Sequence, residues 1–145
     1  MSTVADLLKN KGKEVFSVTP ETPVLEALRL MAEKRIGALL VLDGSKLAGI
    51  FSERDFVRQL AQDASFDIKM PVKKFMTSHL FTVSSSQSVG DCMAMMTDHR
   101  IRHLPVVDGT ELVGLISIGD VVKQAIAARE ERIGHLEDYM SGKAY

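Results

Sequence analysis

Only one cysteine and no long apolar run are found among the 145 residues, and each shortage excludes a class of protein. Cys92 has no second cysteine with which to form an intramolecular disulfide or a paired-cysteine zinc site, which favours a reducing compartment. The longest apolar stretch, Ala38 to Leu42, is far shorter than the roughly 20 residues of a membrane-spanning helix. The opening residues also lack the basic and apolar segments of a secretory signal. We therefore expect a cytoplasmic protein that is not inserted in a membrane.

An excess of charge of one sign is also lacking, because 18 lysines and arginines nearly balance 19 aspartates and glutamates. No strong overall field is available to recruit nucleic acid or a membrane surface, so any site for an anion must be local. The composition, 46% hydrophobic and 26% charged, is that of a folded globular protein rather than a disordered chain.

An internal repeat is the strongest positive signal in the sequence. Placing residues 15–18 over residues 80–83 gives an offset of 65 residues, and the register then holds without a gap as far as Gln59 and Gln124. The sequence therefore contains two copies of one folding unit. Matching pairs include Val24 with Val89, Met31 with Met96, Arg35 with Arg100, Gly49 with Gly114, Ser52 with Ser117, and Asp55 with Asp120.

The apolar pattern changes period at the same places in both copies. Apolar residues recur at helical spacing from Val24 to Met31 and again from Val89 to Met96. Two short apolar runs follow in each copy, separated by an Asp-Gly pair, which predicts a β-hairpin. A second helix is expected after each hairpin. Each copy is therefore predicted to run strand, helix, strand, strand, helix.

We predict an α/β fold with three segments: a first domain over residues 1–66, a second over 67–128, and a helical tail over 129–145. One copy alone is too small to bury a comfortable core, so the two copies are expected to pack as a pseudo-twofold intramolecular pair. Residues 72–76 echo residues 4–8 as the lead-in to each copy, and a longer loop from Lys9 to Lys13 follows the first lead-in.

The tail is expected to extend the last helix, because its apolar residues recur near heptad spacing with one interruption at Arg129. This stripe either packs back on the module or pairs with a second subunit, and we favour a homodimer. The apolar residues concerned are Val122, Ile126, Ile133, Leu136 and Met140.

The sharpest motif is Gly-x-x-Ser-x-x-Asp, which occurs at residues 49–55 and again at 114–120. One interpretation is a helix cap, in which Ser52 and Ser117 accept bonds from first-turn amides and the aspartates complement the helix dipole. The other is a ligand site, since a helix start also presents free amides to a phosphate. Asp55 and Asp120 would then accept hydrogen bonds from ribose hydroxyls.

Other chemistry-bearing residues carry weaker signals. Gly49 and Gly114 would let a flat base approach the backbone closely. His99 and His103 have no third ligand to complete a metal site, so no metal is expected. Cys92 matches Ala27 on the apolar face of a helix, which predicts a buried packing role rather than a nucleophile.

The repeated unit with its Gly-x-x-Ser-x-x-Asp motif resembles a CBS domain, and two in tandem resemble a Bateman module. The segments 52–55, 100–105 and 116–120 further resemble small bacterial stand-alone CBS-pair proteins, some of which hold AMP and NAD. The resemblance implies that Ser52 and Ser117 contact phosphate and that Asp55 and Asp120 hold ribose hydroxyls.

The resemblance also implies that each pocket draws on both copies. One pocket would join Ser117 and Asp120 to residues of the first copy, namely Thr22, Ala27, Ile36, Gly37 and Ala38. The other would join Ser52 and Asp55 to residues of the second copy, namely Gln87, Cys92, Ile101, Arg102 and His103. Phe51 and Ile116, each preceding one of the two serines, complete the predicted set. Because Gly37-Ala38 corresponds to Arg102-His103, the two pockets are expected to differ in ligand or affinity.

We therefore expect a regulatory module that binds an adenosine nucleotide such as AMP, ATP or NAD and signals to a protein target through a change in domain or dimer geometry. The alternative is a scaffold protein in which both motifs are only caps and oligomerisation does not depend on a ligand. An enzyme is disfavoured, because the sequence offers no Walker loop, no Ser-His-Asp constellation and no metal set.

Overall fold

The computed structural model describes residues 2–140, and in it the chain divides into two compact units. The first unit spans Glu14–Phe81 and contains the first copy of the repeat. The second unit joins the N-terminal segment, up to Lys13, to the chain from Thr82 onward, and contains the second copy. The lead-in that precedes the first copy along the sequence therefore belongs to the second unit by its contacts.

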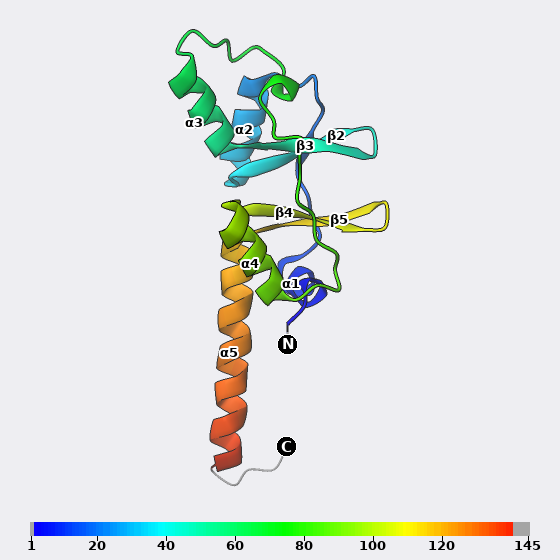
Figure 1. The fold of residues 1–145 in the computed structure, drawn as a ribbon, viewed down its shortest axis with the longest axis vertical. Helices are drawn as coiled ribbons and strands as arrows, with labels where there is room; N and C mark the ends of the chain where they lie inside the picture. Colours follow the sequence, from blue (N-terminus) through cyan, green and yellow to red (C-terminus); the bar gives the residue numbers. More distant parts are fainter. Residues whose placement is uncertain (1, 141–145) are drawn as a thin grey trace. The chain divides into compact units, whose positions relative to one another are not determined.

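The first unit is built on a three-stranded sheet in the order β1 (Ser17–Val18), β2 (Ala38–Asp43), β3 (Lys46–Ser52) (Figure 1). β1 and β2 are parallel, and β2 and β3 form the predicted antiparallel hairpin. The unit also contains helices α2 (Val24–Lys34) and α3 (Glu53–Gln62). The short 3₁₀ helix η1 (Val72–Lys74) comes after them along the chain. The order of elements in this copy is the predicted one.

The second unit repeats this plan with α4 (Val89–His99), β4 (His103–Asp108), β5 (Glu111–Ser117) and α5 (Ile118–Met140), and adds α1 (Val4–Lys11). The predicted first strand is reduced to a single bridge between Val83 and Val106. Pro105 explains the difference. In the first copy the matching Leu40 donates its N–H to Phe16 O, whereas proline has no N–H to donate.

Matching backbone conformations confirm that the two copies fold alike. Gly44 and Gly109 both have φ of 63° at the first position of their hairpin turns, where a type II′ turn favours glycine. Arg35 and Arg100 end α2 and α4 in the left-handed region, with φ of 55° and 54°. Each arginine N–H is directed at the last carbonyls of its helix, as in a left-handed C-cap.

Each unit has its own apolar core, and each lead-in contributes to one of them. Val4, Leu7 and Leu8 of α1 are buried in the core of the second unit. Val72 of η1 is buried in the core of the first unit. Cys92 is also fully buried in the second core, which confirms its predicted packing role, and burial raises the pKa of its thiol, with a smaller contribution from Asp91.

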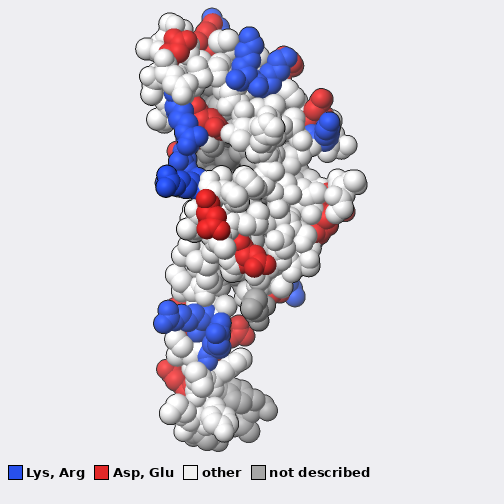
Figure 2. All heavy atoms as spheres, viewed as in Figure 1, with Lys and Arg blue, Asp and Glu red and all other residues white. Residues whose placement is uncertain are grey.

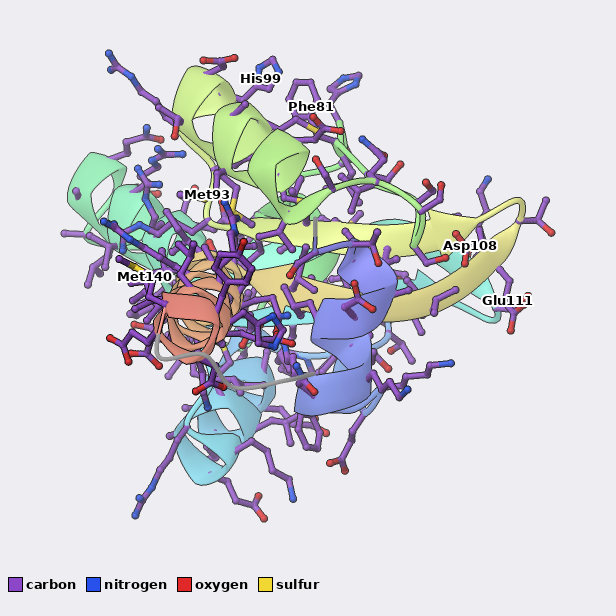
Figure 3. The ribbon with its side chains drawn as sticks, turned by 90° about the horizontal axis from the view of Figure 1, so that it is seen from below. Phe81, Met93, His99, Asp108, Glu111 and Met140 are labelled. Carbon is purple, nitrogen blue, oxygen red and sulfur yellow. The ribbon has the colours of Figure 1, made fainter. Side chains whose placement is uncertain are left out.

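The predicted long C-terminal helix is confirmed as far as Met140 by α5, a continuous helix of 23 residues that runs beyond the rest of its unit (Figure 1). The last part of the predicted helical tail, residues 141–145, lies outside the described residues. Val121 is buried in the core and Ala125 packs against it, while the heptad stripe lies on another face and is exposed. Figure 3 looks along this helix, with Met140 at its end and Met93 on the neighbouring α4. Within the described residues, no helix is both long and apolar enough to span a membrane.

Candidate functional site

The motif of the first unit lies where β3 ends and α3 begins. Ser52 is the N-cap of α3, and its N–H donates to Asp55 Oδ2 at 2.9 Å. Asp55 N–H in turn donates to Ser52 Oγ at 3.2 Å, which completes a reciprocal capping box. Thr77, which follows the second lead-in, donates its hydroxyl to the other carboxylate oxygen, Asp55 Oδ1, at 3.2 Å. Both oxygens of Asp55 therefore accept hydrogen bonds within the unit.

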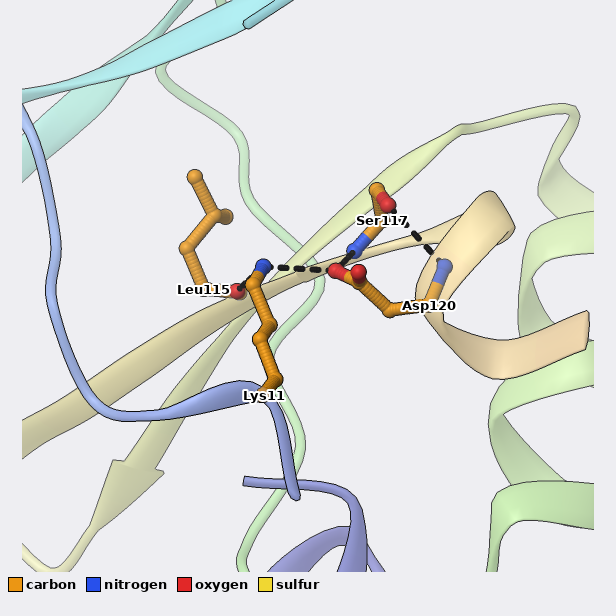
Figure 4. Close-up of polar contacts among 4 residues, drawn as sticks. All are labelled: Lys11, Leu115, Ser117 and Asp120. Atoms are coloured by element: carbon orange, nitrogen blue, oxygen red, sulfur yellow. Dashed lines mark hydrogen bonds and ion pairs between the residues drawn. The ribbon is translucent and has the colours of Figure 1, made fainter. Parts of the chain in front are cut away.

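The motif of the second unit has the same local geometry at the junction of β5 and α5. Ser117 N–H donates to Asp120 Oδ2 at 2.8 Å, and Asp120 N–H donates to Ser117 Oγ at 3.2 Å. The partner from the lead-in differs, because Lys11 Nζ donates to Asp120 Oδ2 at 2.5 Å and to Leu115 O at 2.6 Å (Figure 4). Asp120 is thus paired with a cation, and Asp55 with a neutral hydroxyl.

The capping interpretation is confirmed as a description of this geometry. The same reciprocal box occurs at the start of α1, where Thr3 N–H donates to Asp6 Oδ2 at 2.9 Å and Asp6 N–H to Thr3 Oγ1 at 3.3 Å. That helix start carries no Gly-x-x-Ser-x-x-Asp motif. A Ser or Thr with an aspartate three residues later therefore caps helices in this chain whether or not it belongs to the motif, and the cap alone does not define a ligand site.

Each motif serine lies next to the first residue of the preceding hairpin strand in the same copy. Ser52 pairs with Ala38 across the hairpin, and Glu53 N–H donates to Gly37 O at 3.0 Å. In the second unit Ser117 pairs with His103, and Ile118 N–H donates to Arg102 O at 2.8 Å. The structure brings each motif together with its own copy's pair, Gly37-Ala38 or Arg102-His103. The assignment of these pairs to the other copy's motif stays a prediction.

The remaining predicted site residues fall into two groups. Thr22 and Gln87 are partly exposed and stabilise turns before α2 and α4, since Thr19 N–H donates to Thr22 Oγ1 and Ser84 N–H donates to Gln87 Oε1. The others are apolar and contribute to the two cores, so that their side chains are wholly or partly covered; these are Ala27, Phe51 and Ile36 in the first unit and Ile116 and Ile101 in the second.

Both motif glycines lie close to other atoms of the protein. The space on the Cβ side of each glycine is filled by side-chain or backbone atoms and is not open. A Cβ at Gly49 would lie 2.7 Å from Thr77 O and 2.8 Å from Met76 Sδ. A Cβ at Gly114 would lie 2.9 Å from Leu8 Cδ2. The lead-in segments therefore fill the Cβ side of both glycines, and the expectation that a flat base approaches their backbone stays a prediction.

In the second motif, the pKa values of Asp120 and His103 are both lowered from their usual values. Burial raises the pKa of Asp120, but hydrogen bonds from Lys11 and Ser117 and the charge of Lys11 outweigh it, and the pKa lies below its usual value. Burial lowers the pKa of His103, which the charges of Lys11 and Arg102 lower further against the opposing effect of Asp120. At neutral pH the site therefore holds an ionised aspartate, a charged lysine and a neutral histidine.

Sequence reasoning missed Lys11 and Thr77 as members of these sites. Both belong to lead-in segments that lie 109 and 22 residues from the aspartates they contact. The segment from Lys9 to Lys13 was the available signal, since it adds lysines to the first lead-in that the second does not match. The prediction of a loop from Lys9 onward is wrong, because α1 continues as far as Lys11. Spacing gives no indication that this segment reaches Asp120.

Other features of the described residues do not compete with the motifs. No group of three or more His, Cys, Asp or Glu side chains in residues 2–140 is placed to hold a metal ion. Positive and negative side chains are interspersed on the face shown in Figure 2. A groove of about 330 Å³ between the start of α1 and the middle of α5 contains none of the predicted site residues; it is lined by Ser2, Asp6, Ala128, Glu131, Arg132 and His135.

Fold and motif together define an internally duplicated α/β module in which each copy presents a capped Ser-Asp helix start beside a hairpin. The CBS domain model matches residues 4–62 and 72–126, so this chain belongs to the CBS-domain family as a tandem pair, a regulatory module. The chain is 33% identical to the mitochondrial CBS domain-containing protein CBSX3 of Arabidopsis thaliana, over 97% of this chain and 73% of that protein.

Solved structures agree with this assignment. A protein with CBS domains from Burkholderia ambifaria MC40-6 is 49% identical, with a TM-score of 0.82 over 87% of this chain and 95% of that one. CBSX2, solved in complex with AMP, is 28% identical, with a TM-score of 0.73 over 89% of this chain and 99% of that one.

Proposed function

We propose that this CBS pair is a sensor for adenosine nucleotides of the AMP, ATP or NAD type. In this proposal Asp55 and Asp120 accept hydrogen bonds from ribose hydroxyls, and Ser52 and Ser117 with the adjoining helix amides hold phosphate. Occupancy alters the geometry of the domains or of a dimer, and a protein target reads the change. The nucleotide pool of the cytoplasm is the proposed source of ligand, and a free Cys92 suits that reducing compartment.

The observation that carries this proposal is the repetition of one Ser-Asp geometry at two helix starts that both belong to the CBS motif. The serine N–H to aspartate Oδ2 distances are 2.9 and 2.8 Å, and the return bonds are both 3.2 Å. Related CBSX2 was solved with AMP, which supports the choice of ligand class.

The test is a calorimetric titration of the full chain with AMP, ATP and NAD. Asp55→Asn and Asp120→Asn keep a hydrogen-bond acceptor for the cap but lose the charge, so each is expected to weaken binding at its own site by about tenfold or more. Asp6→Asn is the matched control, because Asp6 caps α1 with the same geometry outside the motif. Absence of binding to the wild-type chain, or equal losses in all three variants, would refute the proposal.

A ligand-independent scaffold is the second candidate function. The cap at Thr3 and Asp6 favours it, because it shows that this geometry forms with no motif around it. In this account the exposed stripe of α5 performs the function through oligomerisation. A melting temperature that does not change across a panel of nucleotides would support the scaffold, whereas stabilisation by one nucleotide class would support the sensor.

We also propose that α5 pairs with α5 of a second copy to form a homodimer. Five exposed apolar residues recur in steps of four, seven, three and four along the helix, which is heptad spacing with Arg129 in the remaining position. Arg132 and Glu137 flank this stripe five residues apart, a spacing that pairs opposite charges across a parallel two-stranded coil. The stripe consists of Val122, Ile126, Ile133, Leu136 and Met140.

A further inference from the structure

The two motif aspartates differ in what the lead-in segments bring to them. Lys11, the last residue of α1, places its ammonium 2.5 Å from Asp120 Oδ2 and 2.6 Å from Leu115 O (Figure 4). Asp55 receives the hydroxyl of Thr77 instead. A lysine therefore contacts one of the two carboxylates proposed to hold ribose. The other carboxylate has no such lysine, although the two copies share the same local fold.

The lysine comes from the part of the chain in which the two lead-ins differ. Leu8 contacts Gly114 as Met76 contacts Gly49, so these two residues occupy equivalent places. Thr77 follows Met76 directly, whereas Lys11 lies three residues beyond Leu8, at the end of α1. The positive charge of Lys11 at the second site is thus not part of the structure that the two copies share.

The ion pair between Lys11 and Asp120 disfavours the binding of an uncharged ligand at Asp120. The side chains of Lys11 and Asp120 are 33% and 24% exposed, so the pair is partly shielded from water. A nucleoside whose hydroxyls bind Asp120 must share or displace the ammonium, and offers it no anionic partner in place of the carboxylate, so that only the bond to Leu115 O is kept. A nucleotide brings a phosphate toward Ser117 and the start of α5, close to the lysine, and the flexible lysine stem lets its charge move from carboxylate to phosphate.

We propose that Lys11 makes the Asp120 site selective for phosphorylated ligands: it holds Asp120 while the site is empty and transfers to the ligand's phosphate when the ribose binds. The Asp55 site, which has Thr77 in place of a lysine, discriminates less between a nucleotide and its nucleoside. This inference rests on the proposed function, because it assigns a selectivity to one of the two nucleotide sites.

The experiment compares AMP with adenosine by calorimetry, using the full chain with Asp55→Asn so that binding at the Asp55 site is weakened and the Asp120 site is observed as the tighter one. We expect AMP to bind at least tenfold tighter than adenosine, and Lys11→Met to reduce that preference by about tenfold. Lys11→Gln is a second variant with the same expectation. Lys73→Met is the matched control, because Lys73 forms an ion pair of equal length, 2.5 Å, with Glu21 outside both motifs.

The outcomes separate this inference from the proposed function. A preference for AMP that is unchanged in Lys11→Met, or lowered equally in Lys73→Met, overturns the role of Lys11 and leaves nucleotide binding standing. Absence of binding by both ligands overturns the proposed function and this inference together. As a readout independent of ligand, carbon-detected NMR titration is expected to show a higher Asp120 pKa in Lys11→Met, and an unchanged pKa would contradict the pairing.

Discussion

Leu8 lies so close to Gly114 that a Cβ on the glycine would be 2.9 Å from Leu8 Cδ2, and Met76 lies against Gly49 in the same way. These two contacts fix each lead-in to the hairpin of its unit. They also explain why a glycine stands at the first position of both motifs, since the space above it is occupied by the protein itself. The motif is therefore part of the packing of each unit as well as a candidate ligand site.

Alanine at the two glycines is expected to have unequal effects on stability. At Gly49 the nearest atom is Thr77 O, which is fixed by bonds of 2.9 and 2.8 Å between Thr77 and Ile50, so Gly49→Ala should cost about 1–3 kcal/mol. At Gly114 the neighbour is the end of a flexible leucine, and Gly114→Ala should cost less. Urea denaturation of both variants measures the difference, and a greater loss in Gly114→Ala would contradict the packing argument.

Glycine at the left-handed C-cap of α2 is expected to stabilise the protein. Arg35 has φ of 55°, a conformation that costs a residue with a Cβ about 1 kcal/mol, whereas glycine adopts it freely. Arg35→Gly should therefore raise the free energy of unfolding by up to about 1 kcal/mol. Lys34→Gly, one residue earlier and inside the helix, is the control and should lower it by about 1 kcal/mol. The two variants are compared by thermal melting, and equal shifts would show that the backbone conformation is not decisive.

Acid is expected to destabilise the second unit through His103. Because its pKa in the folded protein is lowered, mainly by burial and then by Lys11, the unfolded chain binds a proton more readily than the native one. The stability contributed by neutral His103 is complete above the unfolded pKa of about 6.5 and is lost as the pH falls below it. His103→Gln should therefore show a smaller fall in melting temperature between pH 7 and pH 5 than the wild type. Equal falls would exclude His103 as the cause.

Most of the fold could be predicted because the repeat exposes the same local signals twice. The Asp-Gly turns, the helical spacing of Val24 to Met31 and the long C-terminal helix depend on neighbours in the sequence, and all of them are confirmed. The loss of the first strand in the second copy does not follow from the repeat. It follows from Pro105, which stands where the first copy has Leu40 and its backbone N–H donor. One residue without an N–H thus reduced a strand to a bridge.

The site was less predictable than the fold because its decisive contacts join distant parts of the chain. The Ser-Asp caps lie within four residues and follow from local rules. The contacts of Lys11 and Thr77 follow from the exchange of lead-in segments between the units, which no local pattern encodes. The charge that distinguishes the two aspartates is therefore visible only once the chain is folded.

A charge placed in the exposed stripe of α5 is expected to separate the proposed homodimer into monomers. Leu136→Glu puts a carboxylate at a position that is 59% exposed in one chain and would be buried between two, so light scattering after gel filtration should show the mass of one chain. Val57→Glu on α3 is the matched control, since Val57 is 62% exposed but lies outside the stripe, and it should leave the mass of a dimer. A wild-type chain that elutes as a monomer at micromolar concentration would contradict the pairing of α5, and the stripe would then require a partner of different sequence.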